Sequence, residues 1–162
     1  MAAGPDISET LLIHATALVA GEHGVIVRGP SGVGKSDLAL RVLALSPGSL
    51  LAEPVRLVAD DRVAVSRGTG GLMISAPPAI AGKLEVRGLG IVDLPAAAIA
   101  AGPVRLTLVV DLTASRAEVE RLPEWGKTEI LGVPLPFLRL YPFEISAAIK
   151  LILAIGSAPE PT

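Results

Sequence analysis

The sequence contains no cysteine, and charge of neither sign prevails in it. The absence of cysteine excludes disulfide bonds, thiol nucleophiles and zinc sites built on thiolates, and it is compatible with a reducing cytoplasm, where we expect the protein to reside. The 14 Lys and Arg residues nearly balance the 16 Asp and Glu residues, which gives a formal net charge of −2. This balance does not indicate a nucleic-acid partner, so the function must be sought in a local site.

The sequence also lacks an apolar run that approaches the roughly 20 residues of a membrane-spanning helix. The longest candidate, residues 145–155, is interrupted by Lys150 and is interpreted as a helix packed on the core, so no membrane insertion is expected. The N-terminus has no basic segment followed by an apolar one and does not resemble a secretory signal. We expect a single domain over residues 1–162, with flexible ends at 1–8 and 156–162.

One segment, Gly-Pro-Ser-Gly-Val-Gly-Lys-Ser, matches the phosphate-loop (P-loop) pattern. In this pattern the glycines let successive backbone N–H groups point at an anion, the lysine reaches the β- and γ-phosphates, and the serine hydroxyl can ligate Mg²⁺. The predicted nucleotide-binding residues are Gly29, Pro30, Ser31, Gly32, Val33, Gly34, Lys35 and Ser36.

The flanks of this loop agree with nucleotide binding. Residues 24–29 read as a buried strand, and residues 38–45 carry an apolar stripe at helical spacing. A phosphate would therefore lie at a helix N-terminus, where unpaired N–H groups and the helix dipole favour negative charge. The alternative is a glycine-rich turn without a ligand.

The rest of the chain predicts an α/β fold: a P-loop-containing mixed β-sheet with few helices. Pro134 and Pro136 lie in an extended segment whose strands we expect at a sheet edge. A hairpin with a flexible tip at residues 67–71 and the segment around Arg121 are candidates for closing over the site or for contacting the partner. The expected strands are residues 11–20 (paired with the next as a hairpin), 24–29, 55–59, 63–65, 72–75 and 104–111, and the expected helices are residues 38–45 and 142–155.

Carboxylates follow two apolar strands. Asp60 and Asp61 form an adjacent pair, and two neighbouring carboxylates suit a metal ligand beside a general base. Asp111 ends the second strand and is either a turn residue or a site carboxylate. Glu85 opens Glu-Val-Arg-Gly-Leu-Gly, which is either a strand with a bulge or a close backbone approach to a ligand.

Four blocks occur in order: Ile13-His14, the phosphate loop, Leu-Val-Ala-Asp-Asp at 57–61, and Leu-Glu-Val-Arg-Gly-Leu-Gly-Ile-Val-Asp at 84–93. Together they resemble the C-terminal kinase domain of the HPr kinase/phosphorylase family. These bacterial enzymes phosphorylate a serine of HPr, a phosphocarrier protein of the phosphotransferase system, and also remove that phosphate. The resemblance covers about half of the chain and implies a fold like that of HPr kinase and PEP carboxykinase.

The resemblance implies ATP and Mg²⁺ as cofactors and an HPr-like protein as substrate. Lys35 would bind phosphate, Ser36 and Glu85 would ligate Mg²⁺, and Asp61, helped by Asp60, would accept the proton of the target serine. A protein-serine kinase, and in reverse a phosphorylase, is the function we expect. The alternatives are a small-molecule P-loop kinase and a non-catalytic ATP-sensing module.

Two further catalytic residues, His14 and Arg121, are implied by the resemblance alone. On composition, His14 is a core histidine in an apolar strand, and Arg121 is equally well a residue of a solvated helical face. A family loop of sequence Pro-Gly-Arg-Asn is replaced here by residues 133–140, where Arg139 is the remaining candidate for phosphate handling. The resemblance also implies a homo-oligomer, hexameric in the family, and a short form without the N-terminal domain of full-length members.

Overall fold

The computed structural model describes residues 9–162, so the flexible end expected at residues 1–8 lies outside the described part. The strands are β1 (Thr10–His14), β2 (Thr16–Ala20), β3 (His23–Arg28), β4 (Val55–Ala59), β5 (Arg62–Gly68), β6 (Gly71–Ser75), β7 (Lys83–Val86), β8 (Gly90–Asp93), β9 (Val104–Leu112), β10 (Gly126–Ile130) and β11 (Val133–Leu140). The helices are α1 (Lys35–Leu43) and α2 (Ala147–Ser157), with 3₁₀ turns η1 (Pro78–Ile80), η2 (Ala96–Ala98) and η3 (Arg116–Glu118).

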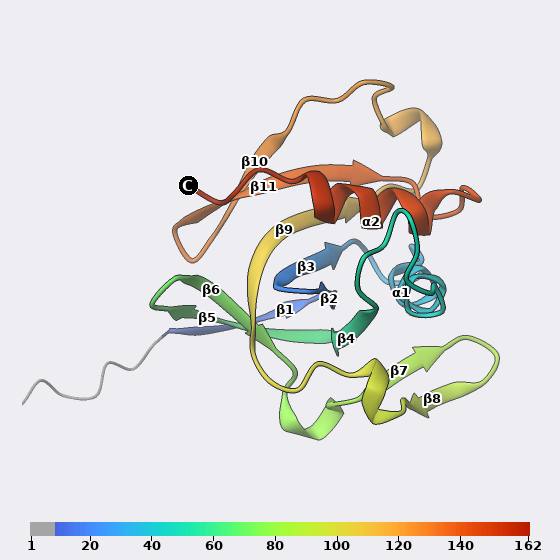
Figure 1. Ribbon diagram of the computed structural model, residues 1–162, viewed down its shortest axis with the longest axis vertical. Coiled ribbons are helices and arrows are strands. Elements are labelled where there is room, and N and C mark those ends of the chain that lie inside the picture. Colours follow the sequence, from blue (N-terminus) through green and yellow to red (C-terminus); the bar gives the residue numbers. More distant parts are fainter. Residues whose placement is uncertain (1–8) are drawn as a thin grey trace, which may run out of the picture.

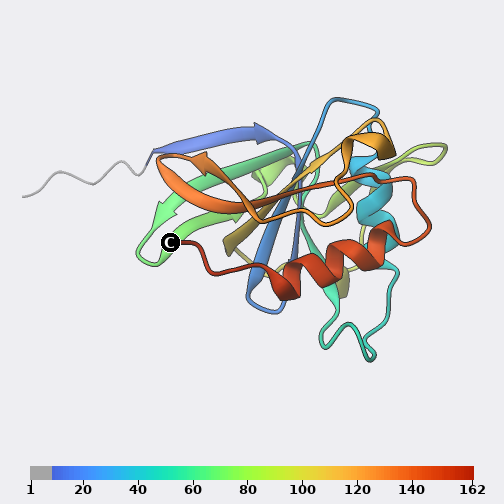
Figure 2. The same cartoon turned by 90° about the horizontal axis from the view of Figure 1, so that it is seen from above.

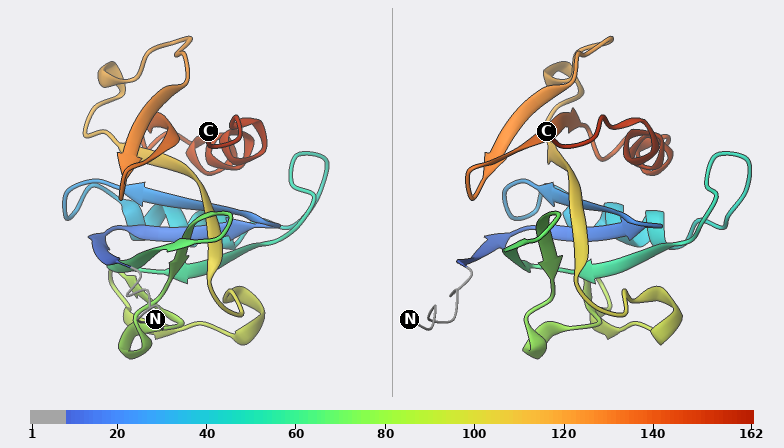
Figure 3. Two further views of the ribbon diagram at one scale, coloured as in Figure 1. Left: turned by 90° about the vertical axis from the view of Figure 1, so that its left-hand side faces the viewer. Right: turned by 60° about the vertical axis from the view of Figure 1, so that its left-hand side comes forward.

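The strands form one large mixed sheet and one small hairpin. The order β1-β5-β6-β9-β3-β2-β4 runs across the large sheet, and β11 joins β9 and carries β10. β9 pairs in parallel with both β3 and β11, whereas its pairing with β6 is antiparallel. β9 curves through the middle of the molecule (Figures 1 and 3), so it belongs to two parts of the sheet. The small hairpin is β7–β8. The predicted mixed sheet with few helices is confirmed.

Two apolar cores lie on opposite faces of the β2–β3–β9 part of the sheet. Alternation along β3 shows the division: Val25 and Val27 join the core beneath α1 and α2, and Ile26 joins the core that includes β5 and β6. Figure 2 shows α2, in red, on one side of the molecule and β1, β5 and β6 on the other. The molecule is therefore layered as helices, sheet and second sheet segment.

Some expected elements have different bounds in the structure. The segment 11–20 is broken at Ala15, because β1 pairs with β5 while β2 forms the predicted hairpin with β3. The expected helix at 142–155 is wrong at its start: α2 begins at Ala147, and Pro142 and Phe143 instead pack against the phosphate loop. No helix among the described residues is long and apolar enough to cross a membrane.

The proline-containing strand β11 is an edge strand along only part of its length. Pro134 and Pro136 pair on one side with β10, and the pairing with β9 begins at Phe137. Proline has no backbone N–H to donate, so residues 134–136 cannot complete hydrogen bonding to strands on both sides. This explains why the pairing of β11 with β9 begins only after Pro136. Leu131 and Gly132 form the two-residue turn between β10 and β11, both with positive φ.

Candidate active site

The phosphate loop leaves β3 and enters α1. Its glycines adopt backbone conformations that L-residues rarely take: φ is 82° at Gly32 and 108° at Gly34. Gly34 caps α1 without a side-chain hydrogen bond, so the first N–H groups of the helix point into the loop. These are the groups that bind an anion at a helix N-terminus.

Lys35 folds back into its own loop. The Lys35 Nζ donates to the carbonyl oxygens of Gly29 at 2.7 Å and Pro30 at 3.0 Å, and the residue is only 8% exposed. Burial lowers the pKa of Lys35, and the nearby carboxylates of Asp60 and Asp61 oppose this shift. A phosphate entering the loop would give this buried ammonium an anionic partner.

Asp60 lies at the centre of a buried hydrogen-bond network and is 5% exposed. The Ser36 hydroxyl donates to both of its carboxylate oxygens, at 2.9 and 3.1 Å. The Thr16 hydroxyl donates to Oδ1 at 2.7 Å, and the backbone N–H of Glu85 donates to Oδ2 at 3.0 Å. The network therefore joins β2, α1 and the β7–β8 hairpin to the end of β4.

A register shift between β2 and β4 aims the Asp60 side chain at this network. Leu18 pairs with Leu57 but Ala17 pairs with Ala59, so Val58 is an extra residue in β4. In a regular strand Asp60 would share a face with Val58, which packs in the core away from the helices. The extra residue reverses that alternation, and such bulges commonly re-aim side chains beside active sites.

Asp61 faces solvent and contacts the predicted histidine. Its φ is 68°, and the Arg62 N–H donates to the Asp60 carbonyl oxygen at 2.8 Å, which forms a tight three-residue turn centred on Asp61. The His14 Nδ1 lies 3.4 Å from the Asp61 Oδ1, and the His14 Nε2 lies 3.5 Å from the Ser31 Oγ. The side chains of His14 and Asp61 are about half exposed, at 49% and 61%. His14 therefore lies at the phosphate loop and not in the core.

Asp111 has a structural partner. β3 and β9 are parallel neighbours, so Arg28 and Asp111 end side by side and form an ion pair with N···O distances of 2.7 and 3.1 Å. This pair holds together the two strand ends from which the phosphate loop and the segment after β9 depart. Asp111 is thus paired with Arg28, a contact that neither of the two alternatives for this residue includes.

The segment before α2 closes one side of the loop. A Cβ atom on Gly34 would lie 3.0 Å from the Phe143 ring, and the Arg41 guanidinium donates to the Pro142 carbonyl oxygen. Glu144 forms ion pairs with Arg116 of η3 and with Lys150 of α2, and the Lys150 hydrogen bond is the main cause that lowers the pKa of Glu144. No signal in the sequence pointed to Phe143.

Other predicted residues are placed less directly. The Glu85 side chain is exposed, and its backbone makes the contact with Asp60. Within residues 9–162, Arg121 makes no hydrogen bond or ion pair with the phosphate loop and lies exposed between η3 and β10. Arg139 lies on β11 above the Phe137 ring, 5.8 Å from its centroid. The expectation that the 67–71 tip covers the site is wrong, because this tip lies at the opposite end of the molecule (Figures 1 and 2).

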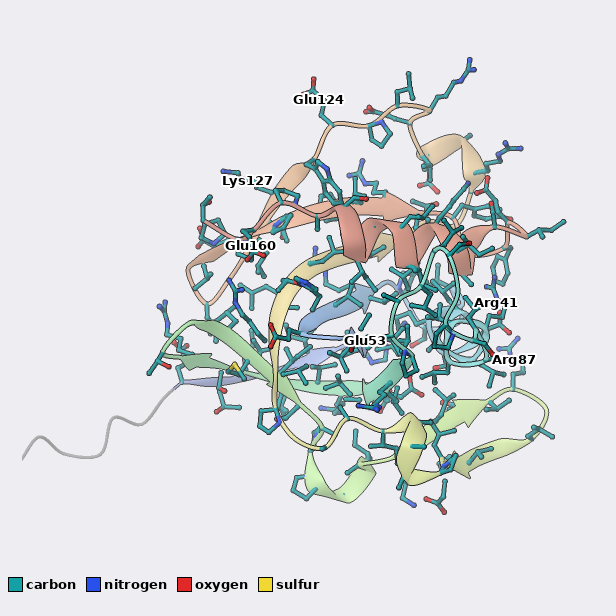
Figure 4. The ribbon with its side chains drawn as sticks, in the orientation of Figure 1. Arg41, Glu53, Arg87, Glu124, Lys127 and Glu160 are labelled. Atoms are coloured by element: carbon teal, nitrogen blue, oxygen red, sulfur yellow. The ribbon has the colours of Figure 1, made fainter. Side chains whose placement is uncertain are left out.

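The elements around the loop gather on one side. In Figure 1 the β7–β8 hairpin lies below α1 and the segment after β9 lies above it, and Figure 2 shows all three at the same end. Figure 4 labels Arg41 on α1 and Arg87 on the hairpin at this side of the molecule. Glu160, which forms an ion pair with Arg105 at 3.0 Å, lies at the opposite side. The open end of the loop is thus flanked by the β7–β8 hairpin and by the segment after β9.

The donor set suits Mg²⁺. Ser36 and Asp60 offer a hydroxyl and a carboxylate within hydrogen-bond distance of each other, which are the hard oxygen ligands that Mg²⁺ prefers. Residues 9–162 contain no group of three or more His, Asp or Glu side chains that could hold a metal alone. Mg²⁺ commonly takes one or two protein ligands and completes its shell with water and substrate phosphates, so Ser36 and Asp60 would be a sufficient protein ligand set.

Comparison with known proteins gives a consistent result. A family model described as the HPr serine kinase C-terminal domain matches residues 6–155. HPr kinase/phosphorylase of Bordetella petrii is 32% identical over 98% of this chain and 50% of its own length, and that of Chloroherpeton thalassium is 32% identical over 82% of this chain and 39% of its own length.

A solved structure, the Hpr(Ser) kinase/phosphatase of Coxiella burnetii, has the same fold, with a TM-score of 0.73 and 23% identity over 90% of this chain and 88% of that one. The chain spans about half the length of the Bordetella relatives that it matches. Since the family model covers nearly all of the described residues, the chain belongs to the HPr serine kinase C-terminal domain family.

Proposed function

We propose that this protein is an ATP-dependent serine kinase whose substrate is an HPr-type phosphocarrier protein. One observation carries the proposal: the Ser36 hydroxyl of the phosphate loop is bound by Asp60, and the next residue, Asp61, is exposed beside the loop. A metal-side carboxylate and a solvent-facing carboxylate are thus adjacent in sequence and differ in environment. Phosphoryl transfer to a hydroxyl requires one group that binds the metal and another that accepts the proton of the hydroxyl.

The loop residues bind and orient ATP. The N–H groups at the start of α1 hold the phosphates, and Lys35 exchanges its contacts with the Gly29 and Pro30 carbonyl oxygens for phosphate oxygens. Ser36 and Asp60 would hold Mg²⁺, with Glu85 as a further candidate ligand from the hairpin. When bound, Mg²⁺ neutralises charge that develops on the β- and γ-phosphate oxygens.

Asp61 acts as the base. It accepts the proton of the substrate serine as the serine oxygen bonds to the γ-phosphorus and the bond from that phosphorus to the β,γ-bridging oxygen breaks, leaving phosphoserine and ADP. His14, 3.4 Å from Asp61, orients this carboxylate. Arg121 would approach the γ-phosphate through movement of its exposed segment.

The reverse direction follows from the same groups. Inorganic phosphate in the loop would attack the phosphorus of phosphoserine, the serine oxygen would leave, and protonated Asp61 would return the proton to it, giving serine and pyrophosphate. Arg139 is paired with the Phe137 ring on β11, so phosphate binding in this direction would depend chiefly on Lys35 and the loop N–H groups.

The test is phosphate transfer from γ-labelled ATP to a purified HPr-type protein with Mg²⁺, using wild type, Asp61→Asn and Asp111→Asn. We expect labelled phosphoserine with wild type and a loss of about 10²-fold or more with Asp61→Asn. Asp111→Asn is the matched strand-end control, and it should retain the reaction at a reduced protein stability. Transfer to a nucleoside or sugar but not to protein serine would contradict the substrate, and label that survives Asp61→Asn would contradict the base.

We further propose that the chain forms a homo-oligomer. The support is a set of large apolar side chains on the surface: Leu89, Ile91, Leu122 and Ile145 are each more than 70% exposed. Light scattering coupled to gel filtration measures the state directly, and a monomer at all concentrations would contradict this proposal.

A further inference from the structure

Thr16 is a polar residue in an otherwise apolar part of β2. It is fully buried, as are Ala17 and Leu18 after it. A buried hydroxyl without a partner is destabilising, so the identity of its partner is informative. That partner is not a backbone group of the sheet but the Asp60 carboxylate, at 2.7 Å.

The hydrogen bonds of Asp60 differ in whether the donor would itself be a metal ligand. Ser36 spans both carboxylate oxygens in the structure, and the same hydroxyl would also serve Mg²⁺ if Ser36 ligates the metal through its oxygen. Thr16 on Oδ1 and the Glu85 N–H on Oδ2 come from elements that do not ligate the metal through these groups. These two donors therefore hold the carboxylate plane independently of the groups that would ligate the metal.

The register shift between β2 and β4 supports this reading. Ala17 pairs with Ala59, so the next pair along the two strands brings Thr16 opposite Asp60 on the same face. Without the extra Val58, Asp60 would not share a face with Thr16. The same irregularity therefore aims the carboxylate and supplies its donor.

We propose that Thr16 is a positioning residue for the metal site: its hydroxyl fixes the Asp60 carboxylate in the orientation in which Asp60 and Ser36 bind Mg²⁺ with ATP. The inference rests on the proposed function. Donors behind a metal ligand typically contribute 10–100-fold to metal affinity, because a ligand that is already oriented loses less freedom on binding.

A second buried threonine provides a matched control. Thr107 on β9 is 4% exposed, and its hydroxyl donates to the Gly24 carbonyl oxygen at 3.2 Å. Thr→Val at either position removes one buried hydroxyl and keeps the shape. The two variants therefore share any general cost to the sheet and differ in whether Asp60 loses a donor.

The experiment titrates Mg²⁺ against binding of a non-hydrolysable ATP analogue by calorimetry, with wild type, Thr16→Val, Thr16→Ser and Thr107→Val. We expect Thr16→Val to raise the Mg²⁺ concentration for half-saturation about tenfold. Thr16→Ser, which keeps the hydroxyl, should stay within about twofold of wild type, and Thr107→Val should match wild type. In a serine-phosphorylation assay, Thr16→Val should raise the KM for Mg²⁺ with little change in kcat at saturating Mg²⁺.

The outcomes separate the two proposals. If wild type and Thr16→Val show the same Mg²⁺ dependence, the proposed role of Thr16 is overturned and the proposed kinase function is not. The same holds if Thr107→Val raises the half-saturating Mg²⁺ concentration as much as Thr16→Val does. A wild-type protein that binds no nucleotide with Mg²⁺ would overturn the proposed function, and this inference with it. Thr16→Ala provides the same comparison if Thr16→Val does not fold, since it also removes the hydroxyl and adds no volume.

Discussion

At the scale of single residues, the two adjacent aspartates owe their different environments to one backbone turn. Asp60 continues the strand inward and is almost fully buried, whereas Asp61 has a positive φ and turns outward beside His14. An L-residue in this conformation stores strain, and such strain is concentrated at functional sites. The turn at Asp61 and the register shift before Asp60 together direct the two carboxylates into different environments.

This geometry predicts different effects for two substitutions of Asp61. Asn tolerates positive φ at least as well as Asp, so Asp61→Asn should remove the base and leave the free energy of unfolding close to that of wild type. Asp61→Ala should abolish transfer equally and also destabilise the fold by about 1 kcal/mol. Urea denaturation of both variants measures the difference, and equal stabilities would show that the turn carries no strain.

Lys35 gives a pH-dependent prediction. Burial lowers its pKa in the folded state below the ordinary 10.5, so over the interval between these values the unfolded chain binds more protons. Stability contributed by this group therefore rises with pH through that interval. The free energy of unfolding of wild type minus that of Lys35→Met should therefore increase between pH 8 and pH 10.

The control for this pH effect is Lys127→Met, at an exposed position of β10. It should show no comparable trend between the same two pH values. Chemical denaturation of wild type and the two variants at each pH gives the six free energies that are needed. A flat difference for Lys35→Met would contradict the burial of the ammonium in the unliganded loop.

At the scale of elements, the sequence predicts what local pattern determines and misses what pairing between distant strands determines. The phosphate loop, the β2–β3 hairpin and the strand before Asp60 follow from glycine positions and apolar periodicity. The direction of the Asp60 side chain depends on a one-residue shift against β2, some 40 positions earlier in the chain, and no local signal encodes it.

The same limit explains the error at the last helix. Residues 142–146 have helical composition in part, but the Pro142 carbonyl oxygen is bound by Arg41 and the Phe143 ring packs on Gly34. These tertiary contacts prevail over the weak local preference. Roles that came from the resemblance, such as those of Glu85 and Arg121, stay predictions.

The contact between Phe143 and the loop predicts a coupled mutational effect. Gly34→Ala should destabilise the protein by about 1–2 kcal/mol through its positive φ and by a further ~1 kcal/mol through the clash with the Phe143 ring. Adding Phe143→Ala should recover only the second part, so the two substitutions should not be additive. Thermal or urea denaturation of the single and double variants measures this coupling.

Gly32→Ala is the matched control, because Gly32 also has a positive φ but a Cβ atom there would meet nothing within 4 Å. Its cost should be unaffected by Phe143→Ala. Equal coupling of Phe143 to both glycines would contradict a direct contact and would point to a general loosening of the segment before α2.

At the scale of the whole molecule, β9 joins the two parts of the sheet and contributes to both apolar cores, with Val109 in one and Leu108 and Val110 in the other. The β7–β8 hairpin, by contrast, is paired only with itself. Stability should therefore be distributed unevenly, with the site assembled between a rigid strand end and a less stable hairpin.

Hydrogen exchange measures this distribution. Backbone amides of β3 and of β9 around Val109 should exchange slowest, by global unfolding, whereas those of β8 should exchange through local opening at a much lower free energy. Mass spectrometry of peptic fragments resolves the two regions. Equally slow exchange in β8 and β9 would show that the hairpin is not an independent unit.

The central position of β9 also has a consequence for how the protein is made. Translation completes the phosphate loop, Asp60 and Asp61 long before it reaches Val104, where β9 begins. Until then, β3 and β6 each lack β9, which is one of their two neighbours in the finished sheet. The edges that β9 will cover are open to pairing with other chains. We therefore expect the nascent chain to carry the phosphate loop, Asp60 and Asp61 without a folded site, and to depend on protection from aggregation until β9 leaves the ribosome.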